Sequence, residues 1–154
     1  MKQTQEKIYL TSEGYNKLQK EYDELVNVKR KEVTQRIARA REYGDISENS
    51  EYDSARDEQS FIEGRILELQ EILKSAQVLT KHNKNAVDIG SKVKVEIDGD
   101  IDEFILVSSV EADPSEGKIS NESPVGSALV GAKLGDVITV SSTIKATYKI
   151  LEIN

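Results

Sequence analysis

The fold is decided by residues 52–76, whose sequence is YDSARDEQSFIEGRILELQEILKSA. Apolar residues recur in this stretch at alternating intervals of three and four, with Gln59 as the one polar exception. This spacing is the heptad pattern of a helix that packs in a coiled coil, and it persists for more than three repeats. The seam consists of Tyr52, Ala55, Ile62, Ile66, Leu69, Leu73 and Ala76.

The preceding segment supplies a second helix that can pair with this one. Charged residues interrupt its seam at positions 29–31, which predicts a local stutter. Thr11 can cap the start of this helix, and Gly44 fits the left-handed position that ends it. We expect helices over 12–43 and about 48–78, joined by a tight turn, with Ser47 or Ser50 capping the second. The seam of the first helix is Tyr15, Leu18, Tyr22, Leu25 or Val26, Val33, Ile37 and Ala40.

The chain changes character near residue 80. Both prolines and six of the nine glycines follow this point, together with most of the β-branched runs. We therefore place two domains at residues 1–79 and 80–154, with residues 81–85 as a polar linker. The second domain is predicted to be rich in strands, with a short helix over 125–130 that Ser123 and Pro124 open and Gly131 closes. The expected strands are 92–97, 103–109, 118–120, 137–141 and 147–153.

Composition excludes several classes of function. The chain of 154 residues has no cysteine, which excludes disulfide scaffolds, thiol nucleophiles and cysteine-ligated zinc. It has one histidine, which excludes metal sites rich in histidine. A net charge of −7 argues against general coating of nucleic acid. No apolar stretch is long enough to span a membrane, and the N-terminus lacks the apolar core of a signal peptide. We expect an α+β protein in the cytoplasm, monomeric and without a membrane partner.

Charge is divided sharply around the expected turn. Residues 29–41 hold six basic side chains and one acidic, whereas residues 42–58 hold seven acidic and one basic. Asp45 and Glu48 lie three apart in the turn, where their carboxylates can converge. Mg²⁺ favours such hard oxygen ligands, yet two carboxylates are too few to hold it alone. The sequence predicts half of a magnesium site; the alternative is an ordinary solvated coiled-coil face. Tyr43 and Tyr52 flank the turn and are expected to pack across it.

Four stretches carry a resemblance to a known family: LTSEGYNKL (10–18), GDISENSEY (44–52), EQSFIEGRI (58–66) and SPVGSALVG (123–131). The chain resembles the Gre-type transcript cleavage factors of bacteria, and within that family the GreA-like transcription elongation factors. The resemblance covers nearly the whole chain, and the run in the turn is its most specific part. One departure is Lys31, where family members often have proline.

The resemblance implies a function. Members insert the coiled coil through the secondary channel of RNA polymerase and stimulate its cleavage of the 3′ end of backtracked RNA. Asp45 and Glu48 match the tip carboxylates that help to hold a Mg²⁺ ion shared with the polymerase. The C-terminal domain would be FKBP-like, with Glu122, Ser123 and Pro124 docking on the channel rim. Arg36, Arg39 and Arg41 are our candidates for contact with the nascent RNA, although pairing with nearby acids is an equal alternative.

Under this interpretation the protein is not itself an enzyme but activates the cleavage activity of the polymerase. Two alternatives stay open. One is a regulator of the same channel that inhibits polymerase without stimulating cleavage, and the other is a coiled-coil adaptor with no catalytic part.

Overall fold

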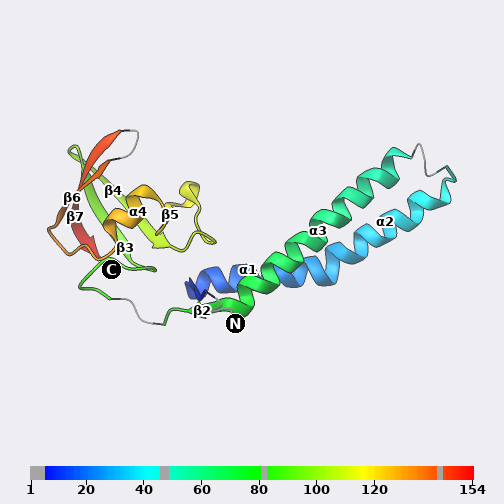
Figure 1. The fold of residues 1–154 in the computed structure, drawn as a ribbon, viewed down its shortest axis with the longest axis horizontal. Coiled ribbons are helices and arrows are strands. Elements are labelled where there is room, and N and C mark those ends of the chain that lie inside the picture. The colour runs from blue at the N-terminus through cyan, green and yellow to red at the C-terminus, as the bar shows by residue number, and fades with distance from the viewer. Residues whose placement is uncertain (1–5, 46–48, 81–82, 142–143) are drawn as a thin grey trace, which may run out of the picture. The chain divides into compact units, whose positions relative to one another are not determined.

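The computed structural model describes residues 6–45, 49–80, 83–141 and 144–154, which form two compact units. One unit is Tyr15–Ser75, and the other combines the described residues of Met1–Gly14 with Ala76–Asn154. The boundary expected between residues 79 and 80 differs from this division, because a strand before the first helix pairs with a strand after the hairpin. The expected α+β class is confirmed: a helical hairpin is followed by a strand-rich region (Figure 1).

The hairpin unit is built from three helical segments and one π turn. Helix α1 (Ser12–Glu24) continues through the π segment Leu25–Lys29 into α2 (Arg30–Glu42), and α3 (Ser50–Ser75) returns beside α2 (Figure 1). The helices confirm the predicted hairpin. Its second helix ends at Ser75 rather than at 78, because Ala76–Val78 forms a strand.

The π turn is the physical form of the expected stutter, and it begins four residues earlier than the charged run suggested. A π turn adds a residue to the helix, which rotates the downstream face relative to the upstream one. Tyr22 before the π turn, Leu25 and Val26 within it and Val33 after it therefore pack in the same cluster. The buried members of that cluster are Val33, Ile37, Ala55, Ile62 and Ile66. Near the end of α3 the expected seam residue Leu73 is half-buried, whereas its neighbour Ile72 is buried.

Three arginines brace the hairpin through ion pairs across its helices. The Arg30 guanidinium donates to both oxygens of Glu63 at 2.7 and 2.8 Å, and Arg65 donates to both oxygens of Glu21 at 2.7 and 3.0 Å. Arg36 bonds to Glu51 and Glu58 of α3. Bidentate arginine–carboxylate pairs fix geometry as well as charge, so they hold the register of the two helices.

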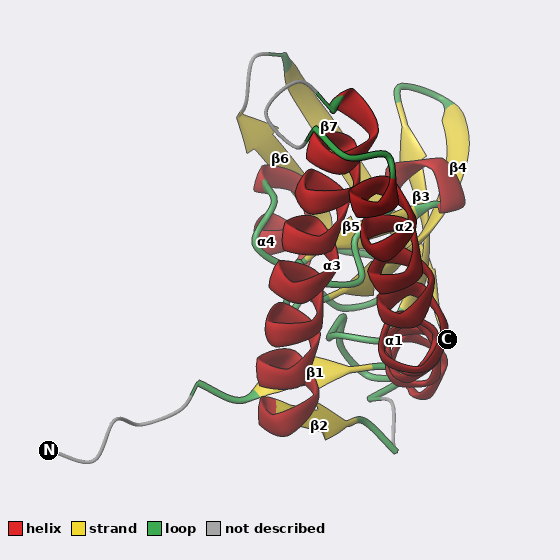
Figure 2. Cartoon of the chain, turned by 90° about the vertical axis from the view of Figure 1, so that its right-hand side faces the viewer, coloured by secondary structure: helices red, strands yellow, loops and turns green. Residues whose placement is uncertain are grey.

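The other unit contains two sheets. Strand β1 (Ile8–Leu10) pairs in parallel with β2 (Ala76–Val78), as Figure 2 shows. A sheet in the order β5-β4-β3-β7-β6 follows, antiparallel except for the β4–β5 pair. Its strands are β3 (Lys92–Ile97), β4 (Asp100–Val107), β5 (Lys118–Ser120), β6 (Val137–Ser141) and β7 (Lys145–Ile153).

Five strands were predicted in this region, and three have the expected bounds. Strand β4 begins three residues early, because Asp98 and Gly99 adopt positive φ and make a two-residue turn between β3 and β4. Strand β7 also begins two residues early. The pair β1–β2 and the 3-10 turn Pro114–Glu116 were not predicted.

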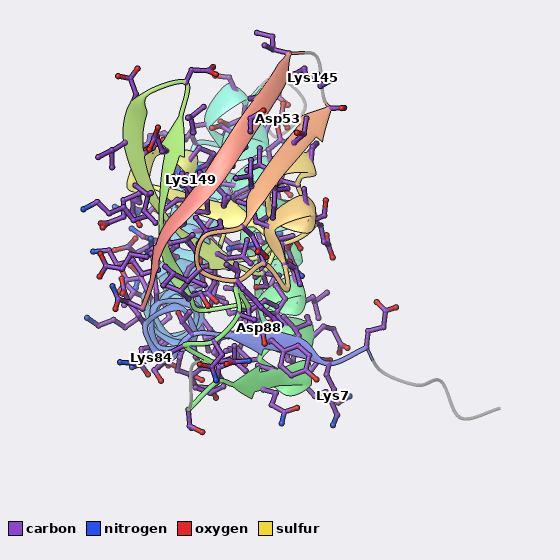
Figure 3. All side chains as sticks on the ribbon, turned by 90° about the vertical axis from the view of Figure 1, so that its left-hand side faces the viewer. Lys7, Asp53, Lys84, Asp88, Lys145 and Lys149 are labelled. Atoms are coloured by element: carbon purple, nitrogen blue, oxygen red, sulfur yellow. The ribbon has the colours of Figure 1, made fainter. Side chains whose placement is uncertain are left out.

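The core of the sheet unit lies between the sheet and α4 (Pro124–Leu129). Exposed and covered residues alternate along β7, and Lys145 and Lys149 lie on its exposed side (Figure 3). The buried cluster consists of Val87, Val93, Val95, Phe104, Leu106, Leu129, Ala132, Ile150 and Ile153. Within the described ranges, none of the helices has the length and apolar character needed to cross a membrane.

Candidate functional site

The end of α2 places one of the two predicted tip carboxylates. Gly44 adopts φ 98°, the left-handed conformation expected of it, and its N–H donates to the Arg41 carbonyl at 3.3 Å. Asp45 follows this stop and is exposed. Glu48 lies outside the described residues, as do Ile46 and Ser47, so its assignment stays a prediction.

Asn49 organises the other side of the turn. Its side-chain oxygen accepts from the Tyr52 N–H at 3.0 Å, which makes Asn49 the N-cap of α3 in place of the expected Ser47 or Ser50. Its side-chain amide donates to the Ala40 carbonyl at 2.7 Å. One side chain therefore satisfies backbone groups at the end of one helix and at the start of the next, and so fixes the neck of the hairpin.

The two tyrosines beside the turn behave differently. Tyr52 packs against the hairpin core, as expected, and the Arg41 guanidinium carbon lies 5.8 Å from the centre of its ring. This distance is within the range of a cation–π contact. Tyr43 is 84% exposed, so the expectation that it packs across the neck is wrong.

The three candidate RNA-binding arginines have distinct surroundings. Arg36 pairs with Glu51 and Glu58, and the hydrogen bond to Glu51 is the main reason that the pKa of its guanidinium is raised. Arg39 donates to the backbone carbonyl of Gln35 at 3.4 Å, and Arg41 stacks on Tyr52. Arg36, Arg39, Ala40, Tyr43 and Glu51 line a hollow of about 240 Å³. Because Arg36 is engaged by Glu51 and Glu58, Arg39 is the arginine of this hollow that can offer its charge to a phosphate group.

The candidate docking residues form the start of α4. The Ser123 hydroxyl accepts from the Gly126 N–H at 3.0 Å and donates to the Ser120 carbonyl at 2.7 Å, so Ser123 is the predicted N-cap. Pro124 occupies the first helical position, and both Pro124 and Glu122 are exposed. Gly126 has no room for a side chain, because a Cβ there would lie 1.9 Å from the Ser120 carbonyl oxygen. The segment is therefore a rigid turn with an acid and a proline at its surface.

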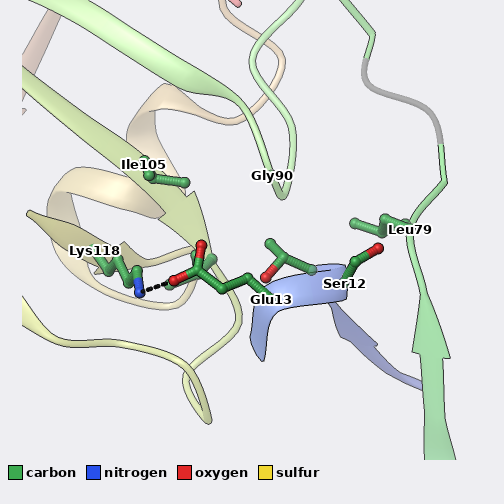
Figure 4. Close-up of a pocket in the computed structure, with 8 residues that line it drawn as sticks. Ser12, Glu13, Leu79, Gly90, Ile105 and Lys118 are labelled. Carbon is green, nitrogen blue, oxygen red and sulfur yellow. Dashed lines mark hydrogen bonds and ion pairs between the residues drawn. The ribbon is translucent and has the colours of Figure 1, made fainter. Parts of the chain in front are cut away.

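Two further hollows lie in the sheet unit. One, of about 270 Å³, is lined by Lys118, whose ammonium bonds to Glu13 at 3.4 Å, as Figure 4 shows. The same ammonium bonds to Glu116 at 2.8 Å. The hydrogen bond with Glu116 is the main cause that raises the pKa of Lys118. Because its one cation is engaged by two carboxylates, this hollow has no free charge for an anion. The other, of about 280 Å³, is lined by residues that include Ser108, Asn121 and Glu122.

Sequence reasoning missed the part of Glu111 in the sheet unit. Its carboxylate accepts from the Thr11 N–H at 2.9 Å and from the Thr11 hydroxyl at 2.5 Å. The same hydroxyl accepts from the Gly14 N–H at 3.0 Å, which confirms Thr11 as the N-cap of α1. The cap was readable from the sequence, but nothing at position 111 indicated its partner one hundred residues away.

The Mg²⁺ that the resemblance implies fits the donor set only as a shared ion. Asp45 offers an exposed carboxylate, the ligand type that Mg²⁺ favours. In the described ranges 6–45, 49–80, 83–141 and 144–154, no three acidic or histidine side chains are grouped to hold a metal. Asp45 can therefore contribute one ligand, and a partner must provide others.

Comparison with known proteins identifies the family. Residues 8–78 match the family described as "Transcription elongation factor, N-terminal", and residues 82–154 match "Transcription elongation factor, GreA/GreB, C-term". The chain belongs to the GreA/GreB family of transcription elongation factors.

Curated relatives agree over nearly the whole chain. Transcription elongation factor GreA of Acetivibrio thermocellus is 51% identical, over 97% of this chain and 98% of the relative. The factor of the same name from Clostridium botulinum strain Langeland is 49% identical, over 96% of each. Among solved structures, GreA factor homolog 1 (Gfh1) of Thermus thermophilus has a TM-score of 0.46 at 29% identity, covering 96% of this chain and 99% of that one.

Proposed function

We propose that this protein inserts its helical hairpin into the secondary channel of bacterial RNA polymerase and stimulates cleavage of backtracked RNA by the polymerase. The observation that carries the proposal is the exposed Asp45, which directly follows the left-handed stop of α2 in a hairpin fixed by Asn49. Family membership and relatives named transcription elongation factor GreA support it.

The tip is assigned two tasks: it positions a Mg²⁺ ion and it supplies negatively charged ligands to that ion. A Mg²⁺ ion shared with the polymerase would neutralise charge at the scissile phosphodiester. Asp45 and Glu48 are assigned the carboxylate oxygens on this protein's side, and Asp45 is exposed shortly after the end of α2. Because they make up only part of a metal shell, the protein alone is expected to have no nuclease activity.

The arginines are assigned to contact with RNA, and the turn before α4 is assigned to docking on the polymerase. Arg39 and Arg41 can offer their charge to phosphates of the nascent RNA, whereas Arg36 must first leave Glu51 and Glu58. Glu122, Ser123 and Pro124 are assigned to docking on the channel rim. Binding and cleavage are therefore expected to depend on different parts of the chain.

The test is rescue of a stalled elongation complex. Purified protein is added to backtracked complexes of a bacterial RNA polymerase that carry RNA labelled at its 5′ end. Shortening of the RNA followed by renewed elongation supports the proposal. Binding that slows elongation without shortening the RNA would instead identify an inhibitory regulator of the channel, and absence of binding would leave the adaptor alternative.

A further inference from the structure

Gly64 stands apart from the other glycines because the chain itself gives no reason for it. Six of the nine glycines adopt positive φ, and a Cβ at Gly14 or Gly126 would collide with a neighbouring group. Gly64 lies inside the 26-residue helix α3. Apart from its two chain neighbours and the adjacent backbone of its own helix, no atom of the described residues comes within 4 Å of a Cβ built there. Glycine is one of the poorest residues for a helix interior, so Gly64 lowers the stability of α3. No contact within the described part of the chain requires a glycine at this position.

Two large apolar side chains lie on either side of this glycine. Phe61 is 73% exposed and Leu67 is 63% exposed. Residues three apart are neighbours along a helix surface, so positions 61, 64 and 67 form one continuous row. The buried residues Ile62, Ile66 and Leu69 lie on a different face of α3. We call the row Phe61–Gly64–Leu67 the notch: two apolar ridges with a gap between them.

The notch is bordered by acids. Asp57, Glu68 and Glu71 are all exposed and lie four or seven residues from a notch position, which puts them on the same side of α3. The exposed Lys74 lies seven residues from Leu67, so the rim holds three acids against one lysine. The nearest cation, Arg65, is engaged by Glu21 and Glu68. Apolar ridges with an acidic rim are complementary to an apolar side chain that stands between lysines or arginines.

We infer that the notch is a docking site for RNA polymerase, at a surface where an apolar side chain flanked by basic residues enters the gap over Gly64. This inference rests on the proposed function and adds a binding contact on the shaft of the hairpin to those of the tip and the α4 turn. Small residues let a partner approach the helix backbone closely, which accounts for glycine at this position. A second copy of this chain fits less well, because its acidic rim would oppose an identical rim.

The experiment combines stability with binding. Gly64→Leu fills the gap with a good helix former, and Phe61→Ser removes one ridge. Gln35→Leu is the matched control, since it adds the same side chain at an exposed position of α2. For each variant, thermal unfolding of the protein alone is compared with its affinity for polymerase in competition with labelled wild type, and sedimentation records self-association.

The expected result is a split between the two readouts. Gly64→Leu should unfold at a higher temperature than wild type yet bind polymerase about tenfold more weakly, the size of loss typical of one well-packed interface side chain. Phe61→Ser should show a similar loss of affinity, and Gln35→Leu should bind as wild type. A mere propensity effect would move only the unfolding temperature.

Three outcomes would overturn the inference. Wild-type affinity in both notch variants, while wild type itself binds and stimulates cleavage, refutes the notch and leaves the proposed function intact. Self-association that Phe61→Ser abolishes, with polymerase affinity unchanged, would assign the notch to a second copy. Failure of wild type to bind polymerase refutes both proposals together.

Discussion

Gly14→Ala should destabilise the protein although alanine is the better helix former. A Cβ at position 14 would lie 1.8 Å from one carboxylate oxygen of Glu111, far inside van der Waals contact. The carboxylate is the end of a flexible side chain, so it can move away. In doing so it gives up its hydrogen bonds with the Thr11 N–H at 2.9 Å and the Thr11 hydroxyl at 2.5 Å.

The magnitude follows from two opposing terms. Hydrogen bonds to an ionised group contribute about 1.5–3 kcal/mol each. Alanine in place of glycine in a helix returns about 1 kcal/mol. Glu111 and Thr11 are half-buried, so water compensates for part of the loss. The net expectation is that the free energy of unfolding falls by about 1–3 kcal/mol.

Urea denaturation of a double-mutant cycle measures this directly. With Glu111→Ala already present, the collision is absent, and Gly14→Ala should then stabilise the protein by up to about 1 kcal/mol. Gly64→Ala is the control in the wild-type background, because its Cβ meets open space and should stabilise. If Gly14→Ala stabilises both backgrounds equally, the contact with Glu111 does not exist in solution.

Three further outcomes are expected. Asn49→Ala should lower the free energy of unfolding by about 1–2 kcal/mol, because it removes a helix cap and the bond to Ala40; Asn49→Asp, which keeps the cap acceptor, should lose less in thermal unfolding, and equal losses would contradict the bridging role. The pKa of Glu63 lies below its ordinary value of 4.5 because Arg30 donates to it. That contribution to stability is present above pH 4.5 and is lost as the pH falls through the lower folded pKa. Acid titration of unfolding for Glu63→Gln should therefore show a shallower loss below that pH, and a profile parallel to wild type would count against the pair. Glu122→Lys combined with Pro124→Ala should weaken polymerase binding while the Ser123 cap keeps α4 folded, and unchanged affinity in a competition assay would remove the docking assignment.

The hairpin could be predicted because its determinants are local in sequence. The three- and four-residue spacing from Tyr52 to Leu69 predicts a helix from residues close together in the chain. The left-handed Gly44 likewise ends α2 through contacts with the preceding turn alone. The stutter was indicated by the charged run at 29–31, but the π turn that produces it lies at Leu25–Lys29. Apolar residues on both sides of that turn were correctly assigned to the core. The spacing of apolar residues indicates which helix face is buried, but it does not indicate the backbone geometry that brings the two faces into line.

Contacts between distant parts of the chain were out of reach. Strands β1 and β2 have three residues each and lie almost seventy positions apart in the chain. Three residues are too few to show the alternation of apolar and polar side chains that predicts a strand. Glu111 holds Thr11 through a carboxylate that the sequence cannot distinguish from other exposed acids. At the turn, the type of Asn49 permitted capping, but its second bond to Ala40 depends on how closely the two helices approach. The notch escaped notice because a helical glycine becomes informative only when the space around it is known to be empty.

The most direct measurement compares binding with cleavage for Asp45→Ala and Glu48→Ala. Asp45 is exposed and Glu48 belongs to the predicted tip, so stability should change by no more than about 0.5 kcal/mol. Each variant is mixed with backtracked polymerase complexes, and both competition against wild type and RNA shortening are recorded. The account predicts undiminished competition with cleavage slowed by a factor of about 10²–10³, the typical cost of one lost electrostatic group at a reacting centre. Cleavage at the wild-type rate, or loss of competition in proportion to loss of cleavage, would contradict the assignment of these carboxylates to the metal.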